Sequence, residues 1–257
     1  MIRIGFDVGG SKIAALALDP QGCEVARRRR DVPRDYAGTL AALVQMVDDL
    51  VGAHGPAVAV GIALPGMIGA GGELIRVVNL PWLEGRPLAA DLEQAVGLPV
   101  RIANDANCFA LSEAVDGAAA GAAVVFGATL GTGVGGGIVV AGQPLAGANA
   151  IAGEWGHNPL ALVAPEDGPS FPCGCGRSGC VETWLNGAAL ARDFARVAGR
   201  AAEGPEIARL AAQDDAAALA ALARYQRRLA TALAGVVNLL DPDVIVLGGG
   251  LSAIASL

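Results

Sequence analysis

The sequence predicts an α/β protein built from two related halves. Short apolar runs typical of buried strands alternate with longer stretches in which apolar residues recur at helical spacing. A pattern of strand, glycine turn and strand occurs over residues 2–18 and again over residues 122–141, which indicates an internal repeat. The composition, 53% hydrophobic but only 4% aromatic over 257 residues, predicts a core of Ala, Val, Leu and Ile in one large or two ordinary domains.

The first half is expected to begin with an antiparallel meander. Its strands are predicted at Ile2–Phe6, Ile13–Leu18 and Cys23–Val32, and the first two are joined by the turn at Gly9-Gly10. The spacing then predicts an amphipathic helix over 36–54, a strand Val58–Leu64 ending in Pro65-Gly66, a helix over 88–96, a strand Val100–Ala103 and a helix Ala106–Ala114.

The second half restarts with strands over 122–130 and 134–141, joined by Gly131-Thr132-Gly133. Residues 160–172 are expected to form a loop, and residues 199–216 a small-residue connection between helices. A helix over 217–240 is stopped by Asp241-Pro242, because the residue before a proline avoids the helical conformation. A strand Val244–Leu247 follows and ends in Gly248-Gly249-Gly250.

Net charge, the N-terminal residues and the glycine content argue against nucleic-acid binding, a signal peptide and a membrane span. The net charge of −7 opposes nucleic acid, and the basic run Arg27–Arg30 is interpreted as a solvated strand end. Met1–Asp7 carries charge where a signal peptide needs an apolar segment. Gly121–Gly142 lacks charge but is rich in glycine, which favours two buried strands over a membrane span.

Cysteine usage indicates a reducing compartment, and the protein is expected in the cytoplasm. Three of the five cysteines form one ligand-like cluster rather than a disulfide framework. Cys23 and Cys108 are interpreted as small apolar core residues, and His54 as a surface residue.

The cysteine cluster predicts a structural zinc site. Cys173, Cys175, Cys180 and His157 supply three sulfur ligands and one imidazole, a closed set of four. The alternative is a group of reduced thiols in a glycine-rich loop. Glu154 and Glu182 lie on either side of this set, where a bound metal would fix their carboxylates for gripping the hydroxyls of a polar small molecule.

Two glycine turns between strands, and a third glycine run at a strand end, are candidates for binding a nucleotide. In Asp7-Val-Gly9-Gly10-Ser11-Lys12, backbone N–H groups and Lys12 could meet phosphate oxygens, and Asp7 could hold hydrated Mg²⁺ through water. The alternative is a tight hairpin with surface charges. Gly131-Thr132-Gly133 and Gly248-Gly249-Gly250 are similar, and three such turns suit a nucleotide in a crevice between domains.

Asn104-Asp105 lies where a strand ends and a helix begins. Asp105 is either a helix cap or a general base that takes a proton from an attacking hydroxyl during phosphoryl transfer. Pro65-Gly66 and Asn79 lie in preceding loops that could supply neutral hydrogen bonds to a sugar.

These motifs resemble one family. D-V-G-G-S-K, A-N-D-A-N-C, L-G-T-G-V-G-G-G, G-E-W-G-H-N-P-L, C-G-C-G-R-S-G-C-V-E-T and V-I-V-L-G-G-G-L-S occur in the order found in ROK-family sugar kinases. The resemblance implies a two-domain actin/hexokinase-like (ribonuclease H-like) ATPase fold with an interdomain cleft. An N-terminal α/β domain would span 1–116 and a C-terminal one 117–257. Family members usually continue past G-G-G-L-S with a helix that packs on the N-terminal domain, so residues 117–257 are expected to lack it.

The resemblance also assigns roles to residues. Asp105 would be the catalytic base. Asp7, Gly9, Gly10, Ser11 and Lys12 would form the first phosphate loop, Gly131, Thr132 and Gly133 the second, and Gly249 and Gly250 would lie near the adenosine. The sugar site would be lined by Asn79, Asn104, Asp105, Glu154, His157 and Glu182, and zinc would be bound by His157, Cys173, Cys175 and Cys180. ATP, Mg²⁺ and structural Zn²⁺ are the implied cofactors, and a homodimer is the implied assembly.

Within the family the chain is most similar to bacterial fructokinases of the manno(fructo)kinase type. The expected reaction is ATP-dependent phosphorylation of the 6-hydroxyl of D-fructose, with N-acetylglucosamine, glucose or mannose as alternative substrates. A sugar-sensing repressor is disfavoured, because the phosphate loop begins at Asp7 and leaves no room for a preceding helix-turn-helix domain. A non-catalytic, zinc-stabilised sugar-binding protein is disfavoured because both phosphate loops and Asp105 are retained.

Overall fold

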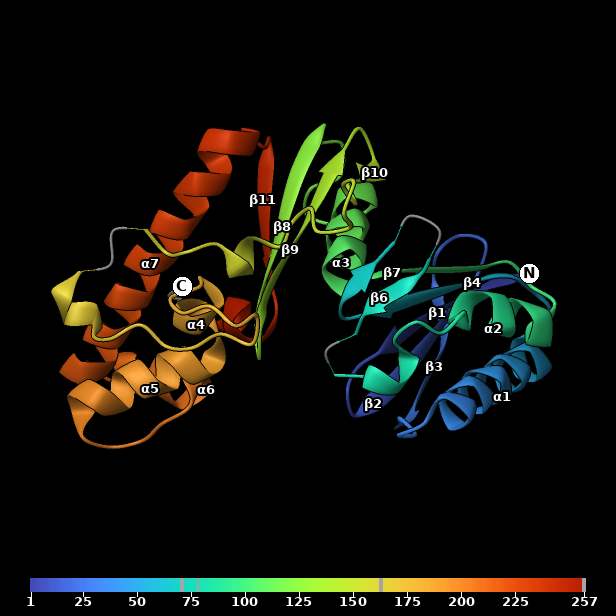
Figure 1. Cartoon of the computed structure of the whole chain (residues 1–257), viewed down its shortest axis with the longest axis horizontal. Helices are drawn as coiled ribbons and strands as arrows, with labels where there is room; N and C mark the ends of the chain where they lie inside the picture. The colour runs from blue at the N-terminus through green and yellow to red at the C-terminus, as the bar shows by residue number, and fades with distance from the viewer. Residues whose placement is uncertain (70–71, 78, 162–163, 256–257) are drawn as a thin grey trace. The chain divides into compact units, whose positions relative to one another are not determined.

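The computed structural model describes residues 1–69, 72–77, 79–161 and 164–255. The chain forms two compact units, residues 1–108 with 146–151 and residues 109–145 with 152–257, each with its own main β-sheet (Figure 1). The division falls inside helix α3 (Asp105–Val115), ahead of the expected boundary at 116. Packing explains this position, because Ala110 is fully buried in a cluster with Val125 and Val139 of the second sheet.

The first unit is built on a five-stranded sheet with the order β3-β2-β1-β4-β7. The expected antiparallel meander is confirmed in β1 (Ile2–Val8), β2 (Lys12–Leu18) and β3 (Glu24–Asp31). β4 (Ala57–Leu64) and β7 (Val100–Asn104) extend it in parallel. Alternate residues of β1 are buried, so one face of this strand enters the core and the other carries Asp7.

Two helices contribute to that core. α1 (Tyr36–His54) begins after Asp35, whose side chain accepts a hydrogen bond from the Gly38 N–H at 2.7 Å. α2 (Leu88–Val96) ends at Gly97 in the left-handed conformation that glycine tolerates best. No element is expected from the sequence between β4 and α2, but β5 (Met67–Ile68), β6 (Leu74–Arg76) and the 3₁₀ turn η1 (Pro81–Leu83) lie there.

The second unit repeats the plan of the first sheet, with the strand order β10-β9-β8-β11. β8 (Val124–Leu130), β9 (Val134–Val140) and β10 (Gln143–Pro144) form an antiparallel meander. β11 (Val244–Gly248) joins β8 in parallel, as β4 joins β1. The predicted internal repeat is therefore confirmed at the level of topology.

Helices α4 (Glu182–Leu185), α5 (Gly187–Ala198) and α6 (Gly204–Ala211) all pack on the long α7 (Ala216–Leu240) (Figure 1). Residues 199–216, predicted as a small-residue connection between helices, contain the additional helix α6. This short helix buries Ile207 and Ala211 in the core shared with α7, and packing of this kind supplies most of the stability of a short helix.

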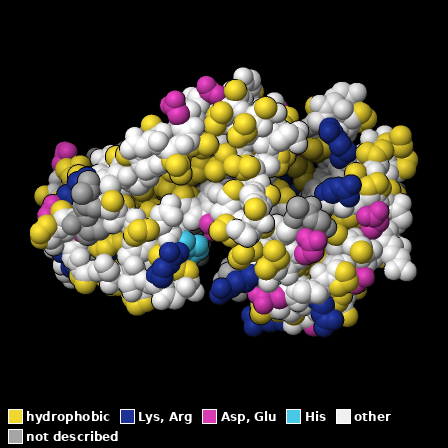
Figure 2. All heavy atoms as spheres, turned by 45° about the horizontal axis from the view of Figure 1, so that its top comes forward, with side chains coloured by type: hydrophobic (Ala, Val, Ile, Leu, Met, Phe, Trp, Pro, Cys, Tyr) yellow, Lys and Arg dark blue, Asp and Glu magenta, His cyan; other side chains and the backbone are white. Residues whose placement is uncertain are grey.

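The surface residues are exposed as predicted, and the prediction that Cys23 lies in the core is wrong. Cys23 is exposed rather than part of the core, because its backbone N–H is held by Asp19 Oδ1 at 2.8 Å in the turn before β3. Arg27–Arg30 and His54 are exposed as expected, and Cys108 is half-buried. On the face shown in Figure 2, Lys and Arg side chains lie in small separate groups among acidic and uncharged ones. None of the helices within the described residues combines the length and apolar character that a membrane span requires.

Candidate functional site

In the first unit, the carboxyl ends of three parallel strands bring together residues that are distant in sequence. The pairings of β1 with β4 and of β4 with β7 place Asp7 beside Ala63, and Leu64 beside Asn104. The carboxyl edge of such strands is where open α/β sheets bind ligands. Asp7, the Pro65-Gly66 turn and Asn104-Asp105 therefore occupy one edge of the first sheet.

At that edge the capping of α3 is carried out by Asn104 rather than by Asp105. Asn104 Oδ1 accepts the Asn107 N–H at 3.1 Å, and its Nδ2 donates to the Gly66 carbonyl at 3.0 Å. Asp105 Oδ1 accepts the adjacent Ala106 N–H at 2.8 Å. Because Asn104 fills the cap, the Asp105 carboxylate is not required for capping α3.

The surroundings of Asp105 also suit a base. Desolvation raises the pKa of this carboxyl above its ordinary value, the Ala106 N–H lowers it, and the negative charge of Asp7 raises it again, with a net upward shift. A carboxylate with a raised pKa accepts a proton more readily than an ordinary aspartate does.

The first glycine turn is closed by the hydrogen bond from the Gly9 N–H to the Lys12 carbonyl at 2.9 Å. A Cβ on Gly10 would lie 2.9 Å from Asn79 Cβ, so glycine is what permits Asn79 to approach the turn. Lys12 Nζ pairs with Asp31 at 3.4 Å, and both side chains are largely exposed. Exposed pairs of this kind are weak, which leaves Lys12 available to an anionic ligand.

In the second unit, the other two glycine motifs meet at the carboxyl ends of the parallel strands β8 and β11. The Gly131 N–H donates to the Gly133 carbonyl at 3.0 Å and closes the turn after β8. Gly249 has φ of 86°, and a Cβ there would lie 2.4 Å from the Leu130 carbonyl oxygen. Any larger residue at 249 would push the third motif away from the second.

The G-E-W-G-H segment packs directly on β9, and the glycines responsible for this were not identified as site residues from the sequence. Trp155 Nε1 donates to the Gly135 carbonyl at 2.7 Å. A Cβ on Gly156 would lie 2.0 Å from the Val134 carbonyl oxygen, and one on Gly153 would lie 2.4 Å from that of Gly136. Two sequence features together could have identified them. One is the glycine on each side of the Glu154-Trp155 pair, and the other is the glycine-rich sequence of β9.

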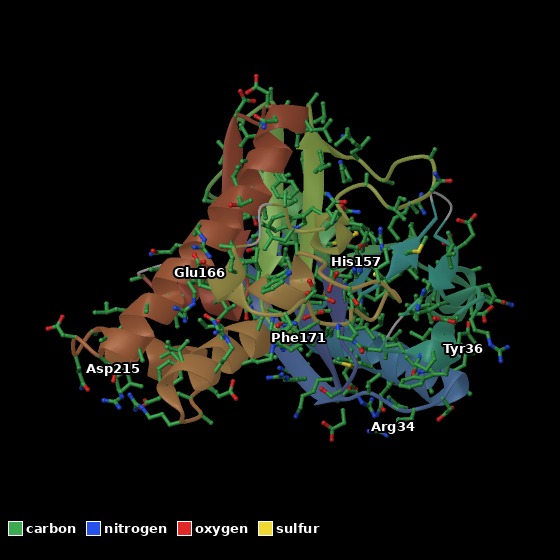
Figure 3. The ribbon with its side chains drawn as sticks, turned by 60° about the vertical axis from the view of Figure 1, so that its left-hand side comes forward. Arg34, Tyr36, His157, Glu166, Phe171 and Asp215 are labelled. Carbon is green, nitrogen blue, oxygen red and sulfur yellow. The ribbon has the colours of Figure 1, made fainter. Side chains whose placement is uncertain are left out.

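The predicted metal ligands converge. The ligand atoms of His157, Cys173, Cys175 and Cys180 all lie within 4.8 Å of one another. Cys175 and Cys180 have their sulfur atoms 3.6 Å apart, and Cys173 Sγ lies 3.4 Å from His157 Nδ1. Tetrahedral zinc with bonds of about 2.3 Å to sulfur would hold two sulfur atoms about 3.8 Å apart, so the donor set fits zinc. Figure 3 labels His157 together with Glu166 and Phe171 of the intervening segment.

The three cysteines of this cluster differ in thiolate character, because burial raises the pKa of Cys173 and of Cys180. Hydrogen bonds from the backbone and then the side chain of Arg177 lower the pKa of Cys175 to about 6. Metal ligation needs the thiolate form of cysteine, so this shift favours binding at neutral pH.

The two glutamates lie against the metal ligands. His157 presents Nδ1 to the cysteines, while its Nε2 lies 3.9 Å from Glu154 Oε2. Cys173 Sγ lies 3.7 Å from Glu182 Oε1. A metal held by this cluster would thus fix the orientation of His157 between the cysteines and Glu154.

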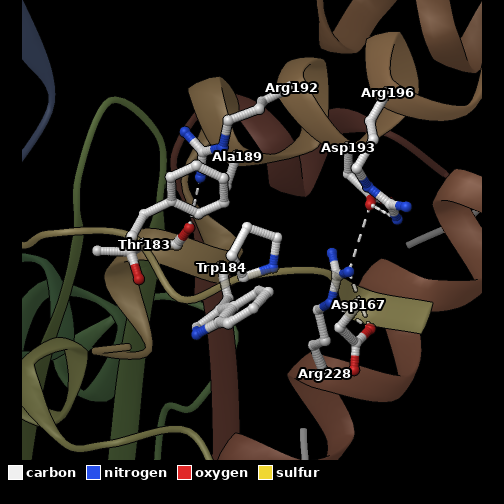
Figure 4. A pocket seen from close by; sticks show the side chains of 10 residues that line it. Asp167, Thr183, Trp184, Ala189, Arg192, Asp193, Arg196 and Arg228 are labelled. Carbon is white, nitrogen blue, oxygen red and sulfur yellow. Dashed lines mark hydrogen bonds and ion pairs between the residues drawn. The ribbon is translucent and has the colours of Figure 1, made fainter. Parts of the chain in front are cut away.

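A buried network of arginines and aspartates, not predicted from the sequence, anchors the loop that carries the cysteines. Asp167 and Arg228 have side chains only 1% and 3% exposed, and Asp167 Oδ1 accepts the Arg228 Nε–H at 2.9 Å. Arg228 also reaches Asp193 of α5 (Figure 4). The guanidinium of Arg192 lies over the ring of Phe171. Burial raises the pKa of Asp193, but hydrogen bonds from Arg196 and Arg224 and nearby positive charges together hold it below its ordinary value. Sequence alone does not pair charges this far apart.

Comparison with known proteins gives consistent matches over nearly the whole chain. The model of the ROK family matches residues 3–257. The N-acetyl-D-glucosamine kinase of Erwinia tasmaniensis is 44% identical over 256 residues, which cover 96% of this chain and 84% of that protein. The N-acetyl-D-glucosamine kinase of Photobacterium profundum is 41% identical, with the same shares of 96% and 84%.

Solved structures of ROK-family proteins are also similar to this chain. A ROK hexokinase from Thermus thermophilus is 34% identical with a TM-score of 0.83, over 98% of this chain and 83% of that one. A ROK glucokinase from Streptomyces griseus, solved with glucose and AMPPNP, is 32% identical with a TM-score of 0.78, over 99% and 85%.

Proposed function

Since the chain belongs to the ROK family, has its two-domain actin/hexokinase-like fold and is an ATP-dependent sugar kinase, we propose that it phosphorylates the 6-hydroxyl of N-acetyl-D-glucosamine. The observation that carries this choice is the 44% identity to an N-acetyl-D-glucosamine kinase over 96% of the chain. Fructose, the substrate expected first from the motifs, is less well supported, because the curated relatives compared are N-acetyl-D-glucosamine kinases rather than fructokinases.

In the proposed reaction Asp105 takes the proton of the sugar's primary hydroxyl while the oxygen attacks the γ-phosphorus of ATP. The bond from that phosphorus to the bridging oxygen breaks, and ADP leaves. Asn104 holds the start of α3 and therefore the position of this carboxylate. Backbone N–H groups of Gly9-Gly10 and Gly131-Thr132-Gly133 stabilise the charge on the phosphates, and Gly249 and Gly250 lie near the adenosine. Bound Mg²⁺, held through water by Asp7, would neutralise part of that charge.

The sugar hydroxyls would be bound by Asn79, Asn104, Glu154, His157 and Glu182. Zinc on His157, Cys173, Cys175 and Cys180 has a structural role in this scheme, because four protein ligands leave no open position for catalysis.

A coupled ADP-release assay with Mg·ATP tests the substrate. We expect kcat/KM for N-acetylglucosamine to exceed that for fructose, glucose and mannose by about tenfold or more, since a site built for the amide leaves polar groups unpaired with the others. A dominant kcat/KM for fructose would reverse the choice, whereas ATP turnover with none of the four would point to another sugar.

The pH dependence of kcat/KM tests the base. Asp105 must be ionised to accept a proton and its pKa is raised, so activity should fall as the pH drops through an apparent pKa above the ordinary 3.8. Because the charge of Asp7 contributes to the raised pKa, Asp7→Asn should move this acid limb to lower pH, whatever its effect on the maximum rate. An acid limb that stays in place in Asp7→Asn contradicts the assignment.

A further inference from the structure

Glu182 lies between the metal ligands and the second glycine turn, and each of its oxygens faces a different site. Oε1 lies 3.7 Å from Cys173 Sγ. Oε2 accepts the backbone N–H of Val134, the residue that ends the glycine turn, at 3.2 Å. A Cβ on Gly133 would lie 2.9 Å from the same oxygen, so glycine at 133 is what allows the carboxylate to come this close.

The segment that carries Glu182 supports the turn at its other end as well. The Gly187 N–H, at the start of α5, donates to the Gly131 carbonyl at 2.8 Å. The Asn186 N–H donates to the Glu182 carbonyl at 3.1 Å, and this links the two supports into one short structure. Residues 182–187 therefore hold both ends of the turn formed by residues 131–134.

This support is continuous with the metal cluster. Cys180 is a predicted ligand, and its carbonyl accepts the Thr183 hydroxyl at 2.8 Å, within the first turn of α4. The next residue, Val181, donates its N–H to the Asn158 carbonyl at 2.8 Å, beside His157. Ordering of the cysteine loop by a metal would thus be transmitted to α4, and through Glu182 to the turn, without any displacement of the sheet.

We propose that Glu182 is a positioning residue for the nucleotide, through which zinc at the cysteine cluster pre-organises the second phosphate turn. Zinc and nucleotide then bind cooperatively in the absence of sugar, and the coupling is reciprocal, as linkage requires. The inference rests on the proposed function in one respect, that residues 131–134 contact the phosphates. It gives Glu182 a role in positioning the nucleotide in addition to binding sugar. It also gives the metal a role in nucleotide affinity in addition to stabilising the fold.

The first experiment measures the affinity of Mg·AMPPNP by titration calorimetry without sugar. Zinc-loaded wild type is expected to bind at least about fivefold more tightly than Cys175→Ser, which loses one ligand but keeps Glu182. Zinc-loaded Glu182→Ala should bind Mg·AMPPNP as weakly as Cys175→Ser does. The variant that combines the two substitutions should lose no more affinity than either single variant. Glu182→Gln is the matched control, because its amide oxygen can still accept the Val134 N–H, and it should retain most of the affinity for AMPPNP.

The reciprocal measurement of zinc release starts from folded, zinc-loaded wild type, Glu182→Gln and Glu182→Ala. Mg·AMPPNP, compared with Mg²⁺ alone, should slow the transfer of zinc to a chromogenic chelator in wild type and Glu182→Gln but not in Glu182→Ala. Hydrogen exchange should show the Val134 amide more protected in zinc-loaded wild type than in Cys175→Ser, while peptides from α1 exchange equally in both.

The outcomes distinguish failure of the zinc–nucleotide coupling from failure of the proposed nucleotide site. If AMPPNP binds wild type with the same affinity whether or not zinc is present, and the nucleotide does not change the rate of zinc release, the proposed coupling of zinc and nucleotide is wrong. The kinase assignment then stands. If zinc-loaded wild type binds no AMPPNP at all, the proposed nucleotide site itself fails.

Discussion

Asp105→Asn is expected to lower kcat for sugar phosphorylation by about 10²–10⁴-fold, the usual contribution of a positioned general base. The Kd for N-acetylglucosamine should stay close to that of wild type, because asparagine keeps the shape and the acceptor oxygen that meets the Ala106 N–H. Single-turnover phosphorylation and sugar titration by calorimetry measure the two quantities separately. Asp116→Asn, an isosteric change at an exposed position after α3, is the matched control and should leave both unchanged.

The stability of Asp105→Asn provides a second check. The folded-state pKa of Asp105 is raised, so the folded protein binds this proton more tightly than the unfolded chain does. The stability contributed by this group is therefore lost as the pH rises through the raised pKa, and above that pKa the ionised carboxylate costs free energy of folding. Asparagine removes that cost, so Tm should not fall. A large drop in Tm with lost activity would indicate a structural role for Asp105 instead.

Asp167→Ala is expected to reduce the free energy of unfolding by about 3–5 kcal/mol, because it leaves the Arg228 guanidinium buried without its main partner. The Asp167 side chain also accepts the Ala164 N–H at 2.7 Å, so the start of the cysteine loop loses its anchor at the same time. Urea unfolding monitored by Trp fluorescence measures the change.

Glu166→Gln is the control for this prediction. Glu166 pairs with Arg227 on the surface, where its side chain is 58% exposed, and exposed pairs contribute little. Equal, small effects of the two substitutions would show that the buried network is not what anchors the loop.

The cysteine cluster shows how much of the site could be predicted locally. Three cysteines close together in sequence and one nearby histidine define a ligand set by residue type alone, and the structure brings all four together. The glycine turns were likewise predictable, because glycine between two apolar strands has few other uses. The choice between fructose and N-acetylglucosamine was not predictable in this way, since both sugars present several hydroxyls, and the proposal for N-acetylglucosamine rests on similarity to whole relatives.

The amino-acid sequence by itself determined most of the strand and helix pattern, the internal repeat, the candidate metal ligands and the candidate base, because these depend on periodicity and on the chemistry of neighbouring residues. The tertiary structure alone decided which residue caps α3, that α6 forms within residues 199–216, and that Asp167 pairs with Arg228. It also decided that Glu182 joins the metal cluster to the second glycine turn. Each of these depends on contacts between segments far apart in the chain, where burial and hydrogen bonding outweigh local propensity.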